Sequence, residues 1–216
     1  EVEDLAQSFK EELGLSGYKV IIGLDRIDYT KGIIERIRAI DKLLDNHPEL
    51  KEKIIFVQMG EISRIHIAQY KQLNERVNAL VEEVNFKHSR HHWKPILFLR
   101  RHLNFKEVLA FYKIADLCIV SSLHDGMNLV AKEFISSKTD EKGALVLSKF
   151  TGASRELKDA WLMNPYSAEE SSSVIFKALS MSEAEKKKRM KKLRQVVQRN
   201  DIWKWIGRII SDIPQE

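Results

Sequence analysis

Residues 117–134 read LCIVSSLHDGMNLVAKEF, and they give the clearest indication of the fold class in the sequence. It opens with a short apolar run, continues through a polar loop that contains Gly126, and ends in the amphipathic pattern of a helix. The apolar run does not alternate with polar residues, which is typical of a strand buried on both faces of a parallel sheet. The stretch therefore predicts one strand–loop–helix unit of an α/β fold.

The same unit recurs along almost the whole chain. Strands are expected at 19–24, 54–58, 96–99, 117–121 and 144–147, with a weaker sixth at 160–163. Helical patterns lie at 31–46, 64–84, 105–114, 128–138 and 168–180, and further helices are expected to open at Ser182 and near residue 200. Asn104 and Glu107 have the spacing of a capping box. The alternation predicts a Rossmann-like, doubly wound parallel sheet of about six strands, in one domain over residues 1–216.

Composition narrows the class of protein and its partners. The chain is 44% hydrophobic and 31% charged, as globular proteins are, and its 36 Lys and Arg against 31 Asp and Glu give a net charge of +5. This charge favours anionic partners without separating nucleic acid from phosphorylated small molecules. No apolar run approaches the roughly 18 residues that span a bilayer, so no membrane partner is expected.

The single cysteine and the start of the chain give two further expectations. Cys118 excludes an internal disulfide and a cysteine metal cluster, and it fits a reducing, cytoplasmic setting. The chain begins with a polar, helix-like stretch and without Met, as a piece of a longer protein would.

The loop after the first expected strand, GLDRIDYTKG at residues 23–32, carries two cations near a strand end. In doubly wound sheets, ligands bind at the carboxyl ends of the strands, where the strand order reverses. Arg26 and Lys31 could clamp a diphosphate there, the guanidinium as a fork and the ammonium as a point charge. The alternative is solvated surface charge. A nicotinamide site is disfavoured because there is no G-x-G-x-x-G.

The loop after the fourth expected strand could complete such a site. Gly126 permits a tight turn, and residues 127–129 would present free backbone N–H groups at a helix start, which attracts phosphate. Asp125 could accept from sugar hydroxyls, and Glu133 could reach a ribose diol. The alternative is that Asp125 only caps the helix and Glu133 is an exposed helix residue.

Taken together and in order, the motifs DRIDYTKG, SRIHIAQY, DGMNLVAKEF, LSKFTGASREL and MNPYS resemble the trehalose-6-phosphate synthase family, from about Lys19 to the C-terminus. The resemblance implies the two-domain GT-B architecture, of which this chain is the C-terminal, donor-binding half. It implies retaining transfer of glucose from UDP-glucose to glucose 6-phosphate, giving trehalose 6-phosphate. The missing N-terminal domain would carry most acceptor contacts and an active-site His, so this half is expected to be inactive alone.

The resemblance also implies roles for individual residues. Arg26, Lys31 and Asp125 are the catalytic candidates, the two cations binding the donor diphosphate and the carboxylate contacting the glucose. Glu133 would hold the ribose, the backbone near Leu103 would read the uracil, and Arg64 would bind the acceptor phosphate. Further donor contacts are expected from the segment made of Gly126, Met127, Asn128, Leu129 and Val130. The family implies neither a metal nor another cofactor.

Two departures leave the substrates open. His124 stands where many members have Arg, and Lys149 where Glu or Gln is frequent. Glycerol 3-phosphate as acceptor, as in glucosylglycerol-phosphate synthases, and ADP- or GDP-glucose as donor remain alternatives. So does a non-catalytic, regulatory member that senses sugar nucleotides, although the four side chains at 26, 31, 125 and 133 argue against it.

Three remaining signals are interpreted as structural. His88, His91 and His92 have a metal-binding spacing for a helix, but Pro95 and the loop-like context argue against one. The basic run at 185–194 lacks interleaved aromatics and reads as a solvated helix face rather than a nucleic-acid site. The last helix, at about 200–212, bears an apolar stripe that we expect to pack toward the absent N-terminal domain, or to allow a homo-oligomer. The stripe comprises Trp203, Trp205, Ile206, Ile209 and Ile210.

Overall fold

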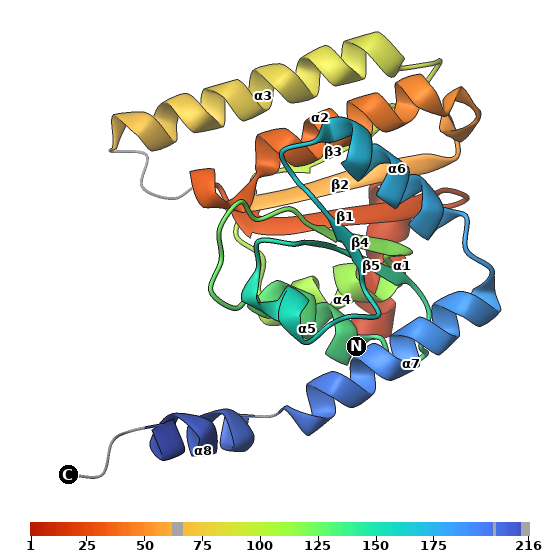
Figure 1. Ribbon diagram of the computed structural model, residues 1–216. Coiled ribbons are helices and arrows are strands. Elements are labelled where there is room, and N and C mark those ends of the chain that lie inside the picture. The colour runs from red at the N-terminus through yellow and green to blue at the C-terminus, as the bar shows by residue number, and fades with distance from the viewer. Residues whose placement is uncertain (62–66, 201, 213–216) are drawn as a thin grey trace.

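The computed structural model describes residues 1–61, 67–200 and 202–212, and its centre is one sheet of six parallel strands in the order β3-β2-β1-β4-β5-β6 (Figure 1). The strands are β1 (Lys19–Arg26), β2 (Ile54–Glu61), β3 (Ile96–Leu99), β4 (Leu117–Val120), β5 (Ala144–Ser148) and β6 (Trp161–Met163). The expected six-stranded parallel sheet is confirmed. Two strands are longer than their apolar runs, because β1 continues to Arg26 and β2 to Glu61 while still paired with each other.

The strand order indicates where on the sheet a ligand site is expected. β1 and β4 are neighbours, and the chain leaves β1 toward β2 and β3 on one side and leaves β4 toward β5 and β6 on the other. The strand order therefore reverses between β1 and β4, and the loops at their carboxyl ends lie on either side of this switch point. β4 is buried along its whole length, as its continuous apolar run predicts.

Helices cover both faces of the sheet (Figure 1). The helices α2 (Ile33–Asn46), α3 (Ala68–His88) and α6 (Ala168–Leu179) pack on one face. The opposite face is covered by α1 (Val2–Glu12), α4 (Phe105–Ile114), α5 (Leu129–Ser137) and α7 (Glu183–Arg199). Apolar side chains from both layers bury the two faces of the sheet, so the core of a doubly wound domain is complete.

Local signals set the helix starts. The Asn104 capping box is present: its Oδ1 accepts from the Glu107 N–H at 3.1 Å, and Glu107 Oε2 accepts from the Asn104 N–H at 2.8 Å. Ser182 caps α7 as expected. The helix expected from about residue 31 begins at Ile33, because residues 29–31 form a separate 3₁₀ turn that ends at Gly32 in the left-handed conformation.

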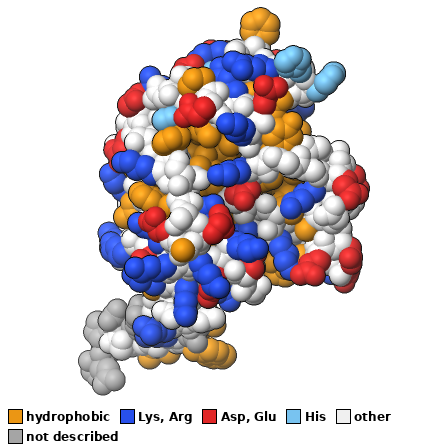
Figure 2. Space-filling view, turned by 90° about the vertical axis from the view of Figure 1, so that its right-hand side faces the viewer, with side chains coloured by type: hydrophobic (Ala, Val, Ile, Leu, Met, Phe, Trp, Pro, Cys, Tyr) orange, Lys and Arg blue, Asp and Glu red, His pale blue; other side chains and the backbone are white. Residues whose placement is uncertain are grey.

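The last helix, α8 (Ile202–Asp212), extends away from both helix layers (Figure 1). Trp203 is 77% exposed and Ile210 is 63% exposed, and Ile202 and Ile206 are exposed as well. Figure 2 shows hydrophobic side chains at this lower end of the molecule, below a surface on which Lys and Arg are mixed with Asp and Glu. The side chains of Trp205 and Ile209 lie outside the described residues. Among the described helices, none is both long and apolar enough to cross a membrane.

Candidate functional site

The loops after β1 and β4 meet at the switch point. The Leu123 N–H donates to the Thr30 carbonyl oxygen at 2.7 Å, which joins the two backbones. Lys31 Nζ donates to Asp125 Oδ2 at 2.8 Å, although the two residues are 94 positions apart in the sequence. The structure therefore brings together two of the three catalytic candidates. The third, Arg26, is the last residue of β1 and is exposed at the same edge of the sheet.

Asp125 is held as a carboxylate by four donors. Besides Lys31, the side-chain amide of Asn128 donates to it at 3.2 Å, the Met127 N–H at 3.3 Å and the Ser122 hydroxyl at 3.5 Å. Burial acts to raise the pKa of Asp125, but these hydrogen bonds, that from Lys31 first, outweigh it and hold the pKa below its usual value. The group is thus an ionised acceptor, positioned at a sheet edge next to a cation.

The N-terminus of α5 lies directly beside this ion pair. Asn128 is the N-cap, and its Oδ1 accepts from the Ala131 N–H at 2.9 Å. Its φ of 78° lies in the left-handed region, an unusual conformation that Asn tolerates better than most residues. The expectation of a free N–H on Met127 is wrong, because Asp125 accepts it. Among the described residues, the N–H groups of Leu129 and Val130 have no acceptor, so the helix retains unpaired donors for an anion.

A third loop, after β5, holds the turn at Gly126 in place. The Gly152 N–H donates to the Asp125 carbonyl oxygen at 2.9 Å, and the Ala153 N–H donates to that of Met127 at the same distance. The Asp125 N–H in turn donates to the Phe150 carbonyl oxygen at 3.3 Å. The segment that begins α5 is therefore fixed from both sides, by the loop after β1 and by the loop after β5.

Two cavities flank the start of α5. Arg26, Leu103 and Val130, three of the predicted donor residues, line a cavity of about 190 Å³. Gly126, Met127 and Leu129 instead line a cavity of about 640 Å³ on the other side, which α8 also borders. The predicted donor residues thus divide between the two sides of one short segment. The smaller cavity lies at the carboxyl ends of β1 and β2, beside the segment that follows β3, and Val130 of α5 closes it on the side of β4. Ligands of doubly wound sheets bind at the carboxyl ends of the strands.

A buried arginine lies beneath the cationic loop. The Arg36 side chain is fully buried, and its guanidinium donates to Asp25 Oδ2 at 2.5 Å and to Gln58 Oε1 at 3.0 Å. Its Nε donates to Ser121 Oγ at 2.9 Å. Burial raises the pKa of Asp25, and the Arg36 guanidinium opposes that shift. One side chain on α2 thereby ties together β1, β2 and the residue that follows β4.

This network reaches the backbone of the loop that carries Lys31. Ser121 Oγ donates to the carbonyl oxygens of Gly32 at 2.8 Å and Lys31 at 3.0 Å. The approach depends on two glycines. A Cβ on Gly23 would lie 2.2 Å from Arg36 Nη1, and a Cβ on Gly32 would lie 2.2 Å from the Ser121 carbonyl oxygen. Lys31 is thus positioned both by the hydrogen bond from Ser121 to its backbone carbonyl and by its ion pair with Asp125.

The remaining predicted residues are Glu133, Arg64 and Leu103. Glu133 is exposed on α5, and its Oε2 accepts from the Tyr112 hydroxyl at 3.0 Å. Leu103 lines the smaller cavity, as described above. Arg64 lies outside the described residues.

His88 is not a loop residue, and the expectation of a loop before β3 is wrong for it. It is the last residue of α3, which continues four residues past the expected end. His91 and His92 lie beyond the helix, where His91 adopts a φ of 51° in a turn. The three histidines therefore do not lie on one face of a helix.

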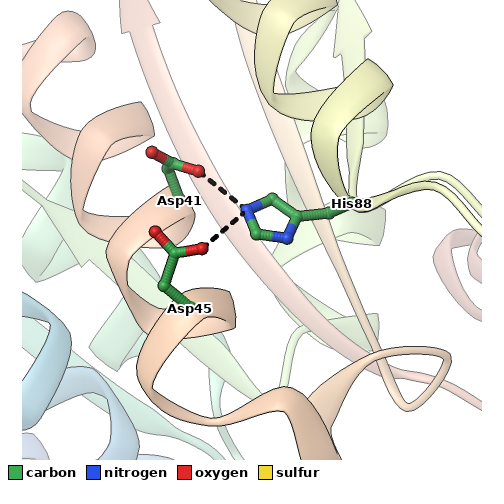
Figure 3. A group of neighbouring side chains, drawn as sticks. All are labelled: Asp41, Asp45 and His88. Carbon is green, nitrogen blue, oxygen red and sulfur yellow. Dashed lines mark hydrogen bonds and ion pairs between the residues drawn. The ribbon is translucent and has the colours of Figure 1, made fainter.

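His88 instead joins an ion cluster between α2 and α3. Its Nε2 lies 2.7 Å from Asp41 Oδ1 and 3.8 Å from Asp45 Oδ1 (Figure 3). Within the described part of the chain, these three side chains are close enough together to hold a metal ion. Lys87 Nζ already donates to both carboxylates, at 2.9 and 2.6 Å. The cluster is a charge-paired contact between helices, away from the switch point.

The basic run at 185–194 forms part of α7. Lys186, Met190 and Leu193 face the core, while the lysines between them are exposed. Arg189 lies over the Trp161 ring, 4.4 Å from its centroid. Figure 2 shows basic and acidic side chains interspersed over the face that it presents. This is the arrangement of a solvated helix face.

Two buried residues with polar contacts near the candidate site were not predicted, although the sequence carries signals for them. Arg36 falls on the apolar side of α2, three positions after Ile33 and four before Ile40, which is the mark of a buried charge. Tyr112 lies likewise among the buried residues of α4. Neither position shows its partner in the sequence, because the partners come from distant strands and helices.

Comparisons with known proteins agree on one family. The model of glycosyltransferase family 20 matches residues 1–215. The UDP-forming α,α-trehalose-phosphate synthase of Pichia angusta is 36% identical over 195 residues, which are 90% of this chain and 41% of that protein. The bifunctional trehalose-6-phosphate synthase/phosphatase of Thermoproteus tenax is 37% identical over 204 residues, 94% of this chain and 28% of that protein. The chain thus spans less than half of these relatives.

Solved structures give the same answer for the fold. The UDP-forming trehalose-phosphate synthase of Burkholderia xenovorans superposes with a TM-score of 0.90 at 30% identity, over 98% of this chain and 49% of that one. The E. coli structure bound with UDP-2-fluoro glucose gives a TM-score of 0.91 at 31% identity, over 99% of this chain and 50% of that one. With a family model that covers almost every residue, the chain belongs to glycosyltransferase family 20.

Proposed function

We propose that this chain is the donor-binding domain of a UDP-glucose-dependent, retaining glycosyltransferase that glucosylates glucose 6-phosphate to trehalose 6-phosphate. The observation that carries the proposal is the 2.8 Å contact between Lys31 and Asp125, which joins the cationic loop after β1 to the start of α5. A cation, an ionised carboxylate and unpaired helix N–H groups then lie together at the point where the strand order reverses.

Similar proteins supply the substrates of the proposal. The matching E. coli structure is bound with UDP-2-fluoro glucose, and a matching Burkholderia xenovorans synthase structure is in complex with glucose-6-phosphate. The curated relatives are named as UDP-forming enzymes. These names favour UDP-glucose over ADP- or GDP-glucose, and glucose 6-phosphate over glycerol 3-phosphate.

The proposed mechanism uses fixed positive charge. Breaking the bond between glucose and diphosphate concentrates negative charge on the departing UDP. Arg26, Lys31 and the N-terminus of α5 would stabilise that charge more in the transition state than in the bound substrate. Asp125 would orient the glucose through its hydroxyls. Because side chains and the helix supply the positive charge, the proposal includes no metal and no cofactor.

The acceptor and a second domain complete the proposed active site. Arg64 remains the proposed contact for the acceptor phosphate. The exposed apolar side chains of α8, among them Trp203 and Ile210, are the proposed contact with an N-terminal domain. This chain by itself is expected to bind donor without turning it over. A cytoplasmic setting is proposed because its lone thiol, Cys118, is buried and unpaired.

Titration calorimetry of the chain with UDP tests this proposal. We expect Arg26→Ala and Lys31→Ala each to weaken UDP binding by about 1–3 kcal/mol, since each removes a charge-assisted contact with the diphosphate. Arg38→Ala is the matched control, because Arg38 is an exposed cation on α2 that lines neither of the two cavities. Wild-type affinity in both site variants would contradict the proposal. Parallel titrations with UDP-, ADP- and GDP-glucose identify the base.

A further inference from the structure

A buried hydroxyl lies behind one of the proposed donor contacts. Tyr112 on α4 is 1% exposed, and its hydroxyl donates to Glu133 Oε2 at 3.0 Å. Glu133 on α5 is exposed, so this hydrogen bond links the core to a carboxylate at the surface. Within the described residues, no other hydrogen bond to the Glu133 side chain is found, which leaves its Oε1 available to a ligand.

Both residues lie close to the smaller cavity. Val108 on α4 and Val130 on α5 line it. Tyr112 follows Val108 by four positions and Glu133 follows Val130 by three, so each pair shares a helix face. Long side chains on a helix lean back toward its N-terminus. We therefore expect the Tyr112 hydroxyl and the Glu133 carboxylate to lean toward the helix turns whose valines line the cavity.

The direction of the hydrogen bond is fixed. Burial raises the pKa of the Tyr112 hydroxyl, and the nearby Cys118 and Glu133 raise it further, so the hydroxyl keeps its proton. Tyr112 must then donate and Glu133 must accept. A carboxylate held in this way presents its remaining lone pairs to other hydroxyl groups, and two neighbouring hydroxyls are the feature of a ribose.

We propose that Tyr112 is a positioning residue that holds Glu133 in place for the two hydroxyls of the ribose in the bound nucleotide. This inference rests on the proposed function, because it assumes a uridine nucleotide in the smaller cavity. Without the hydroxyl of residue 112, the Glu133 side chain would be free to sample other rotamers in solvent. The cost of ordering the Glu133 side chain would then offset part of the free energy gained on binding the ribose.

The substitution Tyr112→Phe separates this role from a structural one. The ring of Tyr112 packs edge-on against Phe134 with their centroids 5.9 Å apart, and a phenylalanine keeps that contact. Removal of the hydroxyl leaves an exposed carboxylate that water can solvate, so the fold should be retained. Tyr18→Phe is the matched control, since Tyr18 is only partly buried and directly precedes β1, at the amino end of that strand, whereas the candidate site lies at the carboxyl ends.

Calorimetric titration with UDP and with 2′,3′-dideoxy-UDP, which lacks both ribose hydroxyls, measures the effect. We expect the wild-type chain to bind UDP at least about tenfold more tightly than the dideoxy compound. Tyr112→Phe should weaken UDP binding about three- to tenfold and change dideoxy-UDP binding less than about twofold. Glu133→Gln should lower the ratio of the UDP affinity to the dideoxy-UDP affinity at least as much as Tyr112→Phe does. Tyr18→Phe should leave this ratio unchanged.

The possible outcomes separate the two proposals. Absence of UDP binding by the wild-type chain overturns the proposed function and this inference together. If the wild-type chain binds UDP but Tyr112→Phe keeps the wild-type ratio of affinities, the inference alone is overturned. An equal loss for both nucleotides overturns it as well, because a purely structural effect would not depend on the ribose hydroxyls.

Discussion

Replacement of Arg36 by methionine is expected to lower the free energy of unfolding by about 3–5 kcal/mol, the cost typical of removing one partner of a buried ion pair. The substitution leaves Asp25 buried without its cation and leaves Gln58 and Ser121 without their shared donor. Methionine fits the methylene part of the site but supplies no N–H group. Because Ser121 also holds the backbone at Lys31, UDP affinity should fall together with stability.

Urea denaturation followed by circular dichroism measures this change. Arg38→Met on the same helix is the matched control, because Arg38 is exposed, and its effect should stay within about 0.5 kcal/mol. An unfolding free energy of Arg36→Met equal to that of Arg38→Met would show that the buried network contributes nothing to stability.

Gly32→Ala is expected to lower the free energy of unfolding by about 2–3 kcal/mol and to abolish measurable UDP binding. Gly32 has a φ of 62°, which is strained for alanine, and the new Cβ would meet the Ser121 carbonyl oxygen. The loops after β1 and β4 would have to separate to relieve the contact. Lys31 would then be drawn away from Asp125 and from the start of α5.

Gly14→Ala measures the backbone strain without the Cβ contact. Gly14 has nearly the same φ, 61°, but nothing lies within 4 Å of a Cβ there. It should therefore show only the backbone cost of the left-handed conformation, about 1 kcal/mol, and keep UDP binding intact. Denaturation and UDP titration of both variants give the comparison. Equal losses of stability and equal UDP affinities would contradict the close approach of the two loops.

The sequence predicted the architecture because each signal for it is local. Apolar runs such as 117–120 identify strands buried on both faces, and the Asn104–Glu107 spacing identifies a helix start. The strand ends were harder to predict, since β1 and β2 continue to Arg26 and Glu61 through pairing with each other rather than through hydrophobicity. The helix after β1 was placed too early because only Gly32 separates the 3₁₀ turn from it.

The candidate site was predictable in its residues but not in their connections. The loop motifs identified Lys31 and Asp125 separately, and the parallel order of the strands explains why they meet. Their direct ion pair, and the hydrogen bond that occupies the Met127 N–H, depend on side-chain geometry that no spacing reveals. The buried partners Arg36 and Tyr112 come from the helices behind the loops, so only the packed structure connects them to the site.

A crystal structure of this chain with UDP would show whether the loops after β1 and β4 form one diphosphate site. We expect the diphosphate within hydrogen-bonding distance of Lys31 and of the N-terminus of α5, with the uridine in the smaller cavity beside Leu103. UDP bound instead in the cavity of about 640 Å³ beside α8 would contradict this expectation. So would a diphosphate that contacts only one of the two loops.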